Sequence, residues 1–96
     1  MAREIFEWDS RKNAANQIKH GVSFEQARAA FLDSRRVVAR DDAHSGGEER
    51  RFCFGKVGEG ILTVRYTIRG LRIRIIGAGF WRKGRMAYEQ ANQLHR

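Results

Sequence analysis

The segment HSGGEERR, residues 44–51, places one histidine, two glutamates and two arginines around a pair of glycines. An imidazole exchanges protons near neutral pH, a carboxylate acts as a base or orients a cation, and a guanidinium holds a phosphate. Together these groups could form a working site. The segment also has the composition of a solvated loop that leads into a strand, so His44, Glu49 and Arg50 are the members most worth testing.

The overall charge of the chain indicates a polyanionic partner. There are 19 Lys and Arg residues against 11 Asp and Glu, which gives a formal net charge of +8 and a pI near 10.8. Such a field raises the local concentration of nucleic acid and speeds its capture. An acidic protein would be attracted by the same field. A membrane surface is a weaker expectation, because the sequence has neither a long apolar run nor a strongly amphipathic basic helix.

Length and cysteine content predict one cytoplasmic domain. The chain has 96 residues, and chains usually divide into domains only beyond roughly 250 residues. The start, MAREIFEWDSRK, lacks the apolar stretch of a secretory signal. Cys53 is the only cysteine, which excludes an intrachain disulfide and fits a reducing compartment. We expect Cys53 to be a small buried side chain and not a nucleophile.

The pattern along the chain predicts an α+β fold. Five segments have the β-branched and aromatic composition, or the alternation, of strands: residues 5–8, 35–40, 50–57, 61–69 and 72–79. The tail from about residue 82 to residue 94 predicts a C-terminal helix. Glycines at 58 and 60 mark a turn between the third and fourth strands.

Two helices are predicted between the first and second strands. Asp9 can cap a helix that runs to about Lys19, and Gly21 can end it in the left-handed conformation. Ser23 and Gln26 have the spacing of a capping box for a second helix that ends near residue 33. The apolar residues of that helix fall on one face: Phe24, Ala27, Ala30 and Phe31.

The last two predicted strands form a hairpin that gathers arginines on one face. Gly70 and Leu71 suit a two-residue turn with glycine first. This turn pairs Arg69 with Arg72, Thr67 with Arg74, and Arg65 with Ile76. The other face then carries the apolar residues Val64, Tyr66, Ile68, Ile73 and Ile75. Like charges directly opposite one another cost stability unless an anion is near, which favours a phosphate platform over a solvated face.

Four motifs in order along the chain resemble one family. They are FEWD at residues 6–9, N..KHGVSFEQA...F at 16–31, DD.HS..EER at 41–50 and V.YT.R....RIIGA at 64–78. Together they resemble the BrnT family of toxins from bacterial type II toxin–antitoxin systems. The sequence departs from the family pattern at Gly79, where many members have arginine, and at Ile68, where an acid commonly precedes the arginine of YT.R.

This resemblance implies a fold, an activity and a partner. The implied fold is RelE-like, with two N-terminal helices packed on an antiparallel β-sheet and a C-terminal helix, in a single domain over residues 1–96. The implied activity is that of a small endoribonuclease that cleaves cellular RNA and inhibits translation. The implied partner is a BrnA-like antitoxin with a ribbon-helix-helix fold. We expect a heterotetramer that contacts DNA only through the antitoxin.

Metal-independent RNA cleavage uses the 2′-hydroxyl of the substrate as nucleophile, and the protein supplies a base, an acid and cations. The expected catalytic residues are His20, His44, Glu49 and Arg69. The expected RNA-binding residues are Lys19, Arg50, Arg65, Thr67, Arg72, Arg74 and Arg82. Three histidines without the spacing of metal ligands, and one cysteine, form no recognisable metal site, so we expect no metal and no other cofactor.

Several of these residues also have structural explanations. Lys19 and His20 fall in the last turn of a helix, where positive side chains meet the helix dipole. His44 can bond to the backbone of its own turn. Trp8 and Trp81 can stack on bases or serve as packing. Two other functions stay open: a basic nucleic-acid-binding module without chemistry, and a degenerate toxin that acts as a partner in a repressor complex.

Overall fold

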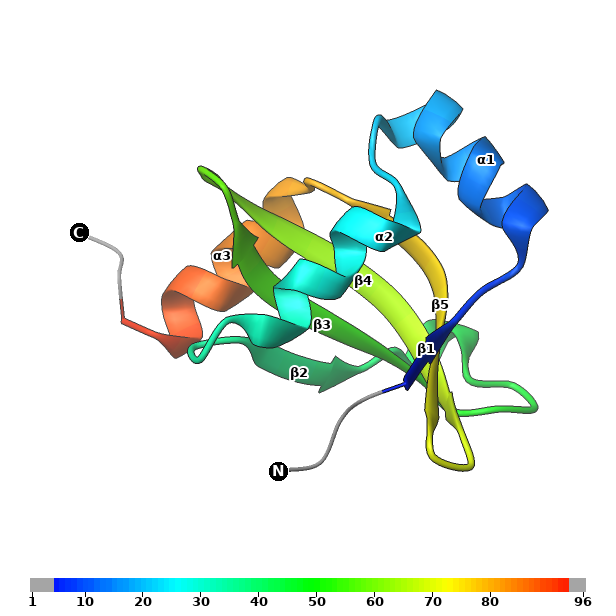
Figure 1. The fold of residues 1–96 in the computed structure, drawn as a ribbon. Helices are drawn as coiled ribbons and strands as arrows, with labels where there is room; N and C mark the ends of the chain where they lie inside the picture. The colour runs from blue at the N-terminus through cyan, green and yellow to red at the C-terminus, as the bar shows by residue number, and fades with distance from the viewer. Residues whose placement is uncertain (1–4, 94–96) are drawn as a thin grey trace.

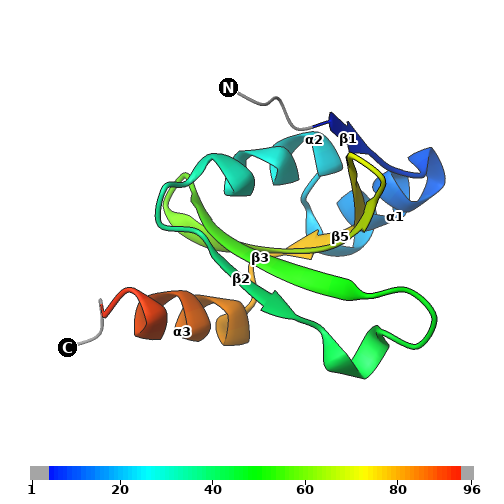
Figure 2. The ribbon, with the colours of Figure 1, turned by 90° about the horizontal axis from the view of Figure 1, so that it is seen from below.

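A five-stranded β-sheet forms the middle layer of the protein, and helices lie on both of its faces (Figure 1 and Figure 2). The computed structural model describes residues 5–93. The strands are β1 (Ile5–Glu7), β2 (Val37–Arg40), β3 (Arg50–Val57), β4 (Gly60–Arg69) and β5 (Arg72–Gly79). The helices are α1 (Ser10–His20), α2 (Phe24–Ala27) and α3 (Arg82–Ala91), with 3-10 turns η1 (Arg28–Leu32) and η2 (Asp42–His44). The α+β class predicted from the sequence is confirmed.

The two N-terminal helices begin and end at the predicted signals. The Asp9 carboxylate accepts two backbone N–H groups of the first turn of α1, at 2.8 and 3.2 Å. Gly21 ends α1 with a φ of 69°. The capping box of Ser23 and Gln26 is present at the start of α2. These local side-chain bonds satisfy N–H groups that a helix leaves free at its start, which is why they could be predicted without knowledge of the fold.

The second helix changes from α-helical to 3-10 geometry where it meets the sheet. η1 lies so close to β3 that a Cβ at Gly55 would collide with the backbone of Ala30. Only glycine allows the two backbones to approach so closely. The predicted apolar face of this helix is confirmed, since Phe24, Ala27, Ala30 and Phe31 are all buried.

The sheet is mixed, so the expected RelE-like arrangement of two N-terminal helices on an antiparallel sheet is wrong. The strand order is β1-β5-β4-β3-β2, and β1 pairs with β5 in parallel, whereas the other pairs are antiparallel. The helices are also divided between the faces: α2 and η1 lie on one, and α3 lies on the other (Figure 2). A three-residue strand carries no local signal of its direction, and the pattern of α3 does not indicate which face it covers.

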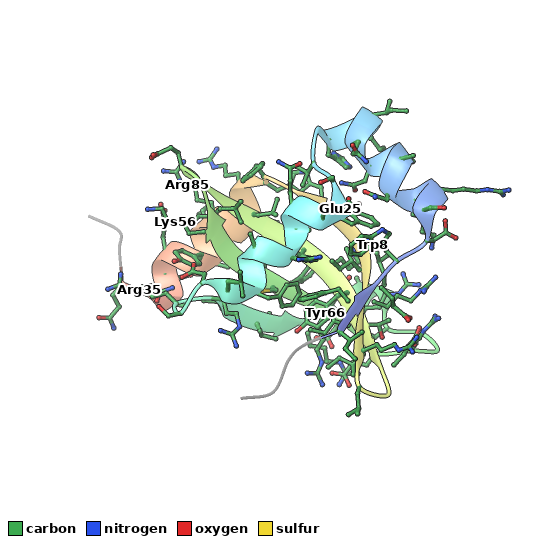
Figure 3. The ribbon with its side chains drawn as sticks, viewed as in Figure 1. Trp8, Glu25, Arg35, Lys56, Tyr66 and Arg85 are labelled. Atoms are coloured by element: carbon green, nitrogen blue, oxygen red, sulfur yellow. The ribbon has the colours of Figure 1, made fainter. Side chains whose placement is uncertain are left out.

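The core lies between the sheet and the layer of α2 and η1. The predicted apolar face of the hairpin joins it, since Val64, Tyr66 and Ile75 are buried and Ile73 packs against the cluster. Figure 3 shows Trp8 and Tyr66 in this region. The prediction is wrong for Ile68, which is 48% exposed because the tip of the hairpin extends past the helices (Figure 1). Each large apolar side chain buried here contributes about 1.5–3 kcal/mol.

Helix α1 is held by polar side chains, because its buried residues are Asn13 and Asn16. The Asn16 amide donates to the carbonyl of Ala78 at 2.9 Å and to that of Val22 at 2.8 Å, and its oxygen accepts the N–H of Ala78 at 3.2 Å. Asn13 accepts the N–H of Phe24 at 2.8 Å. The Asn16 side chain therefore pairs with the backbone of β5 as a neighbouring strand would, at Ala78, past residues 72–74 that pair with β1.

Asn16→Ala should destabilise the protein, because it leaves buried backbone groups of Ala78 and Val22 without partners. Each such group costs about 1–3 kcal/mol, so we expect a total loss of at least about 2 kcal/mol in the free energy of unfolding. Urea denaturation would measure it. Ile18→Ala, in the same helix but at a side chain that is 89% exposed, is the matched control and should stay within about 0.5 kcal/mol of the parent. Equal effects of the two variants would contradict the role of Asn16.

Helix α3 is attached to the opposite face by close packing and one carboxylate. Gly84 lies so close to the Thr63 side chain of β4 that no Cβ would fit. The Tyr88 hydroxyl donates to Oδ2 of Asp33 at 2.7 Å. The same carboxylate accepts the backbone N–H groups that follow it at Arg35, at 2.9 Å, and in β3 at Lys56, at 2.7 Å. Asp33 therefore joins α3 to β3 at the end of the molecule where Figure 3 labels Arg35 and Lys56.

The attachment through Asp33 should weaken in acid. Burial raises the pKa of Asp33, but the hydrogen bonds from Lys56, Arg35 and Tyr88 outweigh burial and hold the pKa below its ordinary value. A carboxylate with a depressed folded pKa contributes stability above its unfolded pKa, and this contribution disappears as the pH falls through the folded value. Tyr88→Phe should therefore cost about 1 kcal/mol at neutral pH, and progressively less as the pH falls through the lowered pKa of Asp33. Urea unfolding over a series of acidic pH values tests this, and a cost independent of pH would contradict it.

Candidate nucleic-acid interface

The β4–β5 hairpin brings arginines to one face as the turn predicts, up to a bulge at Arg65. The pairs Arg69 with Arg72 and Thr67 with Arg74 are confirmed. The third pair is wrong, because the register shifts next to Arg65, which lies opposite Gly77 and not opposite Ile76. A bulge of this kind bends a strand and turns nearby side chains. We call Arg65, Arg69, Arg72 and Arg74 the arginine face.

Each residue of the arginine face lies beside a carboxylate of the protein. The ion pairs are Arg65 with Asp41 at 3.3 Å, Arg69 with Glu48 at 2.9 Å, and Arg72 and Arg74 with Glu7, both at 3.2 Å. Glu7 reaches its partners because β1 is parallel to β5, which sets it opposite Arg74. Carboxylates of the protein itself relieve the repulsion between the facing arginines. The facing arginines alone therefore do not predict a bound phosphate.

A phosphate that binds to the arginine face would have to displace these carboxylates. The displacement costs little free energy at the exposed residues Arg69 and Arg72. Hydrogen bonds from Arg69 lower the pKa of Glu48, and those from Arg72 and Arg74 lower the pKa of Glu7, so both acids are ionised at neutral pH. The side chains of Arg69 and Arg72 are 52% and 61% exposed. Exposed ion pairs contribute only about 0–1 kcal/mol, so a multivalent polyanion can replace the carboxylates.

A hollow of about 370 Å³ lies between α1 and β5, at the bulge. We call it the cationic hollow, and its lining residues are Lys12, Ala15, Asn16, Lys19, His20, Arg65, Ile76, Gly77 and Trp81. Helix α1 supplies Lys12, Lys19 and His20, and β4 supplies Arg65. The Asn16 hydrogen bonds hold α1 in place beside β5. The cationic hollow therefore surrounds one space with several groups that bind phosphate.

A second hollow, of about 570 Å³, lies beside the first and shares Arg65 and Trp81 with it. We call it the aromatic hollow, and its lining residues are Asp41, Ala43, Phe52, Phe54, Thr63, Arg65, Trp81, Lys83 and Gly84. The rings of Phe52 and Phe54 are stacked, with centroids 5.7 Å apart and planes 23° from parallel. The Arg65 guanidinium lies over the Phe52 ring, 5.9 Å from its centroid, a cation–π contact.

Trp81 is positioned by the absence of a side chain at Gly79. An ideal Cβ at Gly79 would lie 2.5 Å from two atoms of the indole, so any other residue would displace the ring. The His20 ring meets the indole edge to face, with centroids 5.1 Å apart. Gly79, where the family resemblance led us to expect arginine, thus leaves room for the indole. The indole occupies the place of the missing side chain.

Two of the predicted catalytic residues lie away from the cationic hollow. The Glu49 carboxylate pairs with Arg51 at 3.3 Å, and Arg51 lies opposite the buried Tyr66, on the other side of β4 from the arginine face. Arg69 lies at the end of β4 with Glu48. For His44 the structure places the backbone in η2, but its side chain lies outside the described part. His20 is thus the one predicted proton-transfer group that the described residues bring to a hollow.

The predicted RNA-binding residues are spread along the sheet. Lys19 and Arg65 line the cationic hollow. Arg50 lies opposite Thr67, which puts it on the arginine face of the sheet. Thr67 itself is 1% exposed, and its hydroxyl donates to the carbonyl of Glu49 at 2.7 Å, so that hydroxyl is not at the surface. Arg82, at the start of α3, lines a separate hollow beside Phe80 and Met86.

Lys12 and Phe52 were not among the residues predicted for the site. A signal for Lys12 existed, because residues 12, 16 and 19 have the spacing of one helical face. For Phe52 the sequence was ambiguous, since an aromatic residue in a strand belongs to the core as readily as to a binding surface. The fold decides between these roles, because α3 covers Phe54 and leaves part of Phe52 exposed.

No set of three metal-binding side chains occurs among residues 5–93, leaving aside the side chain of His44. Within the same part of the chain, no helix is both long enough and apolar enough to span a bilayer. The single cysteine, Cys53, is buried as predicted.

The fold and these surfaces define a small basic α+β protein whose cationic side chains line a hollow and one face of the sheet. A family model described as the ribonuclease toxin, BrnT, of type II toxin–antitoxin systems matches residues 8–84. The chain therefore belongs to the BrnT family, and as a type II toxin it has an antitoxin partner. The matched stretch includes every residue that lines the cationic and aromatic hollows. No curated protein matches the chain.

Glu48→Gln should strengthen binding to single-stranded RNA, because it releases Arg69 from a competing carboxylate. One added phosphate contact should steepen the dependence of log K on log salt by about 0.7. Fluorescence anisotropy with a 2′-O-methyl oligoribonucleotide, which cannot be cleaved, measures this over a salt series. Glu89→Gln is the matched control, since Glu89 pairs with Arg85 within α3. If both variants bind as the parent does, Arg69 does not contact the RNA.

Proposed function

We propose that this protein is a metal-independent endoribonuclease that cleaves cellular RNA at the cationic hollow and thereby inhibits translation. Membership of the BrnT family supports the reaction class. The observation that carries the location is the convergence of Lys12, Lys19, His20 and Arg65 on one space. The 2′-hydroxyl of the RNA attacks the adjacent phosphorus and the 5′-oxygen leaves. The products are a 2′,3′-cyclic phosphate and a 5′-hydroxyl end.

In this proposal the residues of the hollow have distinct roles. His20 transfers a proton to or from the reacting oxygens, since it is the imidazole that lines the hollow. Arg65 and Lys19 stabilise the charge that develops on the phosphate. Arg65 suits this role because its buried Nε lies 3.3 Å from Asp41 without an aligned hydrogen bond. This Nε–H group is therefore still able to donate a hydrogen bond to a phosphate oxygen.

The other predicted residues have supporting roles in the proposal. Arg50, Arg69, Arg72 and Arg74 bind the sugar-phosphate backbone that leads away from the hollow. Arg69 also remains a candidate for transition-state charge. His44 directly follows Ala43 of the aromatic hollow and is proposed as the second proton-transfer residue. Glu49 is proposed to act by orienting Arg51, which it already contacts.

The proposal includes the partner and the setting. We infer that a BrnA-like antitoxin of the ribbon-helix-helix class neutralises the toxin in the cytoplasm. The two chains form a heterotetramer in which the antitoxin alone contacts DNA. A rival function is a basic module that binds RNA without chemistry. The rival differs in tolerating the loss of His20, because phosphate binding alone requires only cations.

Antitoxin-free protein should cleave RNA in the presence of EDTA, and His20→Ala should slow the cleavage by about 10²–10⁴-fold because it removes a proton-transfer group. Gel analysis with end-group mapping would measure the rate and identify the cyclic phosphate. Affinity for an uncleavable 2′-O-methyl RNA should change little, because the Lys and Arg side chains that supply most of the phosphate binding are unchanged.

Gln17→Ala is the control for this experiment, since Gln17 is exposed on the same helix and does not line the hollow. Cleavage by His20→Ala at the parental rate would remove His20 from the mechanism. Absence of cleavage by folded, antitoxin-free protein across several RNAs would favour the binding module. A rate that disappears with EDTA and returns with a divalent ion would overturn the metal-independent reaction.

A further inference from the structure

The aromatic hollow and the cationic hollow lie on either side of a shared boundary. Arg65 and Trp81 line both. A phosphate held at Arg65 therefore has its attached nucleoside beside the aromatic hollow. At about 570 Å³, that hollow is within the range of about 300–1,000 Å³ in which proteins bind small ligands. The space is next to the proposed reacting group, but the cleavage step makes no use of it.

The walls of the aromatic hollow have the chemistry that binds a nucleobase. Phe52 presents a partly exposed ring, backed by the stacked ring of Phe54. Trp81 is 37% exposed at the boundary. Flat aromatic faces stack on any base, because every base has a π face. Lys83 and Arg65 add positive charge at the rim, where the sugar-phosphate backbone would lie.

Trp81 lies at a position where other residues would make the protein more stable. Trp81 is the N-cap residue of α3 and makes no side-chain bond to the helix, at a position where Ser, Thr, Asp or Asn normally stabilises the first turn. The chain also has glycine at 79, which gives up strand stability and provides the room for the indole. Two features that each reduce stability thus serve to hold one exposed ring beside Arg65.

We propose that the aromatic hollow is a nucleobase-binding pocket that holds one unpaired base of single-stranded RNA next to the phosphate that is cleaved. The identification of the ligand as RNA rests on the proposed function. The base is unpaired because the bases of an RNA duplex are stacked inside it and present no free face. Trp81 and Phe52 contact the base, and Arg65 contacts the phosphate beside it. The pocket thereby selects an unpaired nucleotide, of any base, at the cleavage position.

The test compares two uncleavable ligands of equal charge: a 2′-O-methyl oligoribonucleotide and the same backbone without bases. The base-bearing ligand should bind about tenfold more tightly, because stacking adds to phosphate binding. Trp81→Ala should remove most of this difference, because it lowers affinity for the base-bearing ligand far more than affinity for the abasic ligand. Trp81→Phe should keep most of it. Gly79→Ala should act like Trp81→Ala, since the added methyl displaces an indole that is still present.

Phe80→Ala is the matched control, because Phe80 is the neighbouring exposed aromatic residue and lines a different hollow. Circular dichroism and thermal unfolding show whether each variant is folded. If Trp81→Ala is misfolded, Trp81→Phe and Gly79→Ala carry the comparison.

The outcomes separate this pocket from the proposed function. Equal binding of both ligands, or an equal loss for both in Trp81→Ala, overturns the pocket even if RNA is still cleaved. A base-dependent affinity that needs Trp81, in a protein that cleaves no RNA, supports the pocket and contradicts the ribonuclease. Loss of antitoxin binding in Trp81→Ala with base discrimination intact would assign the aromatic hollow to the protein partner, and so would also overturn the proposal.

Discussion

The bond that the rest of the site depends on is the one between the Asn16 side chain and the backbone of Ala78. Helix α1 buries two asparagines against the protein. A single amide, paired with one strand position and with the carbonyl of Val22, sets the distance between α1 and β5. Apolar packing tolerates sliding more readily than a two-point hydrogen bond. The cationic hollow has a defined shape because α1, which forms one of its walls, is held to β5 by a directional contact.

A second constraint is the balance between arginines and carboxylates on the sheet. Glu7, Glu48 and Asp41 hold the guanidinium groups of the arginine face in place and supply the negative charge that nucleic acid would otherwise supply. The surface is thus ordered before any ligand arrives, which lowers the entropy cost of binding. The same acids would reduce affinity for a nucleic acid, because its phosphates would have to displace them. A basic surface of this design favours long polyanions over single phosphates.

Sequence reasoning succeeded where the signal was local and failed where it depended on contacts between distant segments. Asp9, Gly21 and Ser23 act through their own backbone neighbours, and residues 50–57 and 72–79 were predicted as strands at their observed bounds. The parallel direction of β1, the face chosen by α3 and the bulge beside Ile76 have no such signal, since each follows from tertiary packing. Of the site, the facing arginines were predicted. Their acidic partners and the hollow between α1 and Trp81 required the fold.

The order of the segments along the chain has a consequence for the newly made protein. The cationic hollow takes Lys12, Lys19 and His20 from the first quarter of the sequence, whereas Gly77 and Trp81 come from the last. Strands β3, β4 and β5 follow one another through short turns and can form early, but α1 and β1 pair with residues about sixty positions away. A chain still emerging from the ribosome exit tunnel has the α1 residues of the cationic hollow but not yet Gly77 and Trp81. Truncated translation products that lack the end of β5 therefore contain no assembled site.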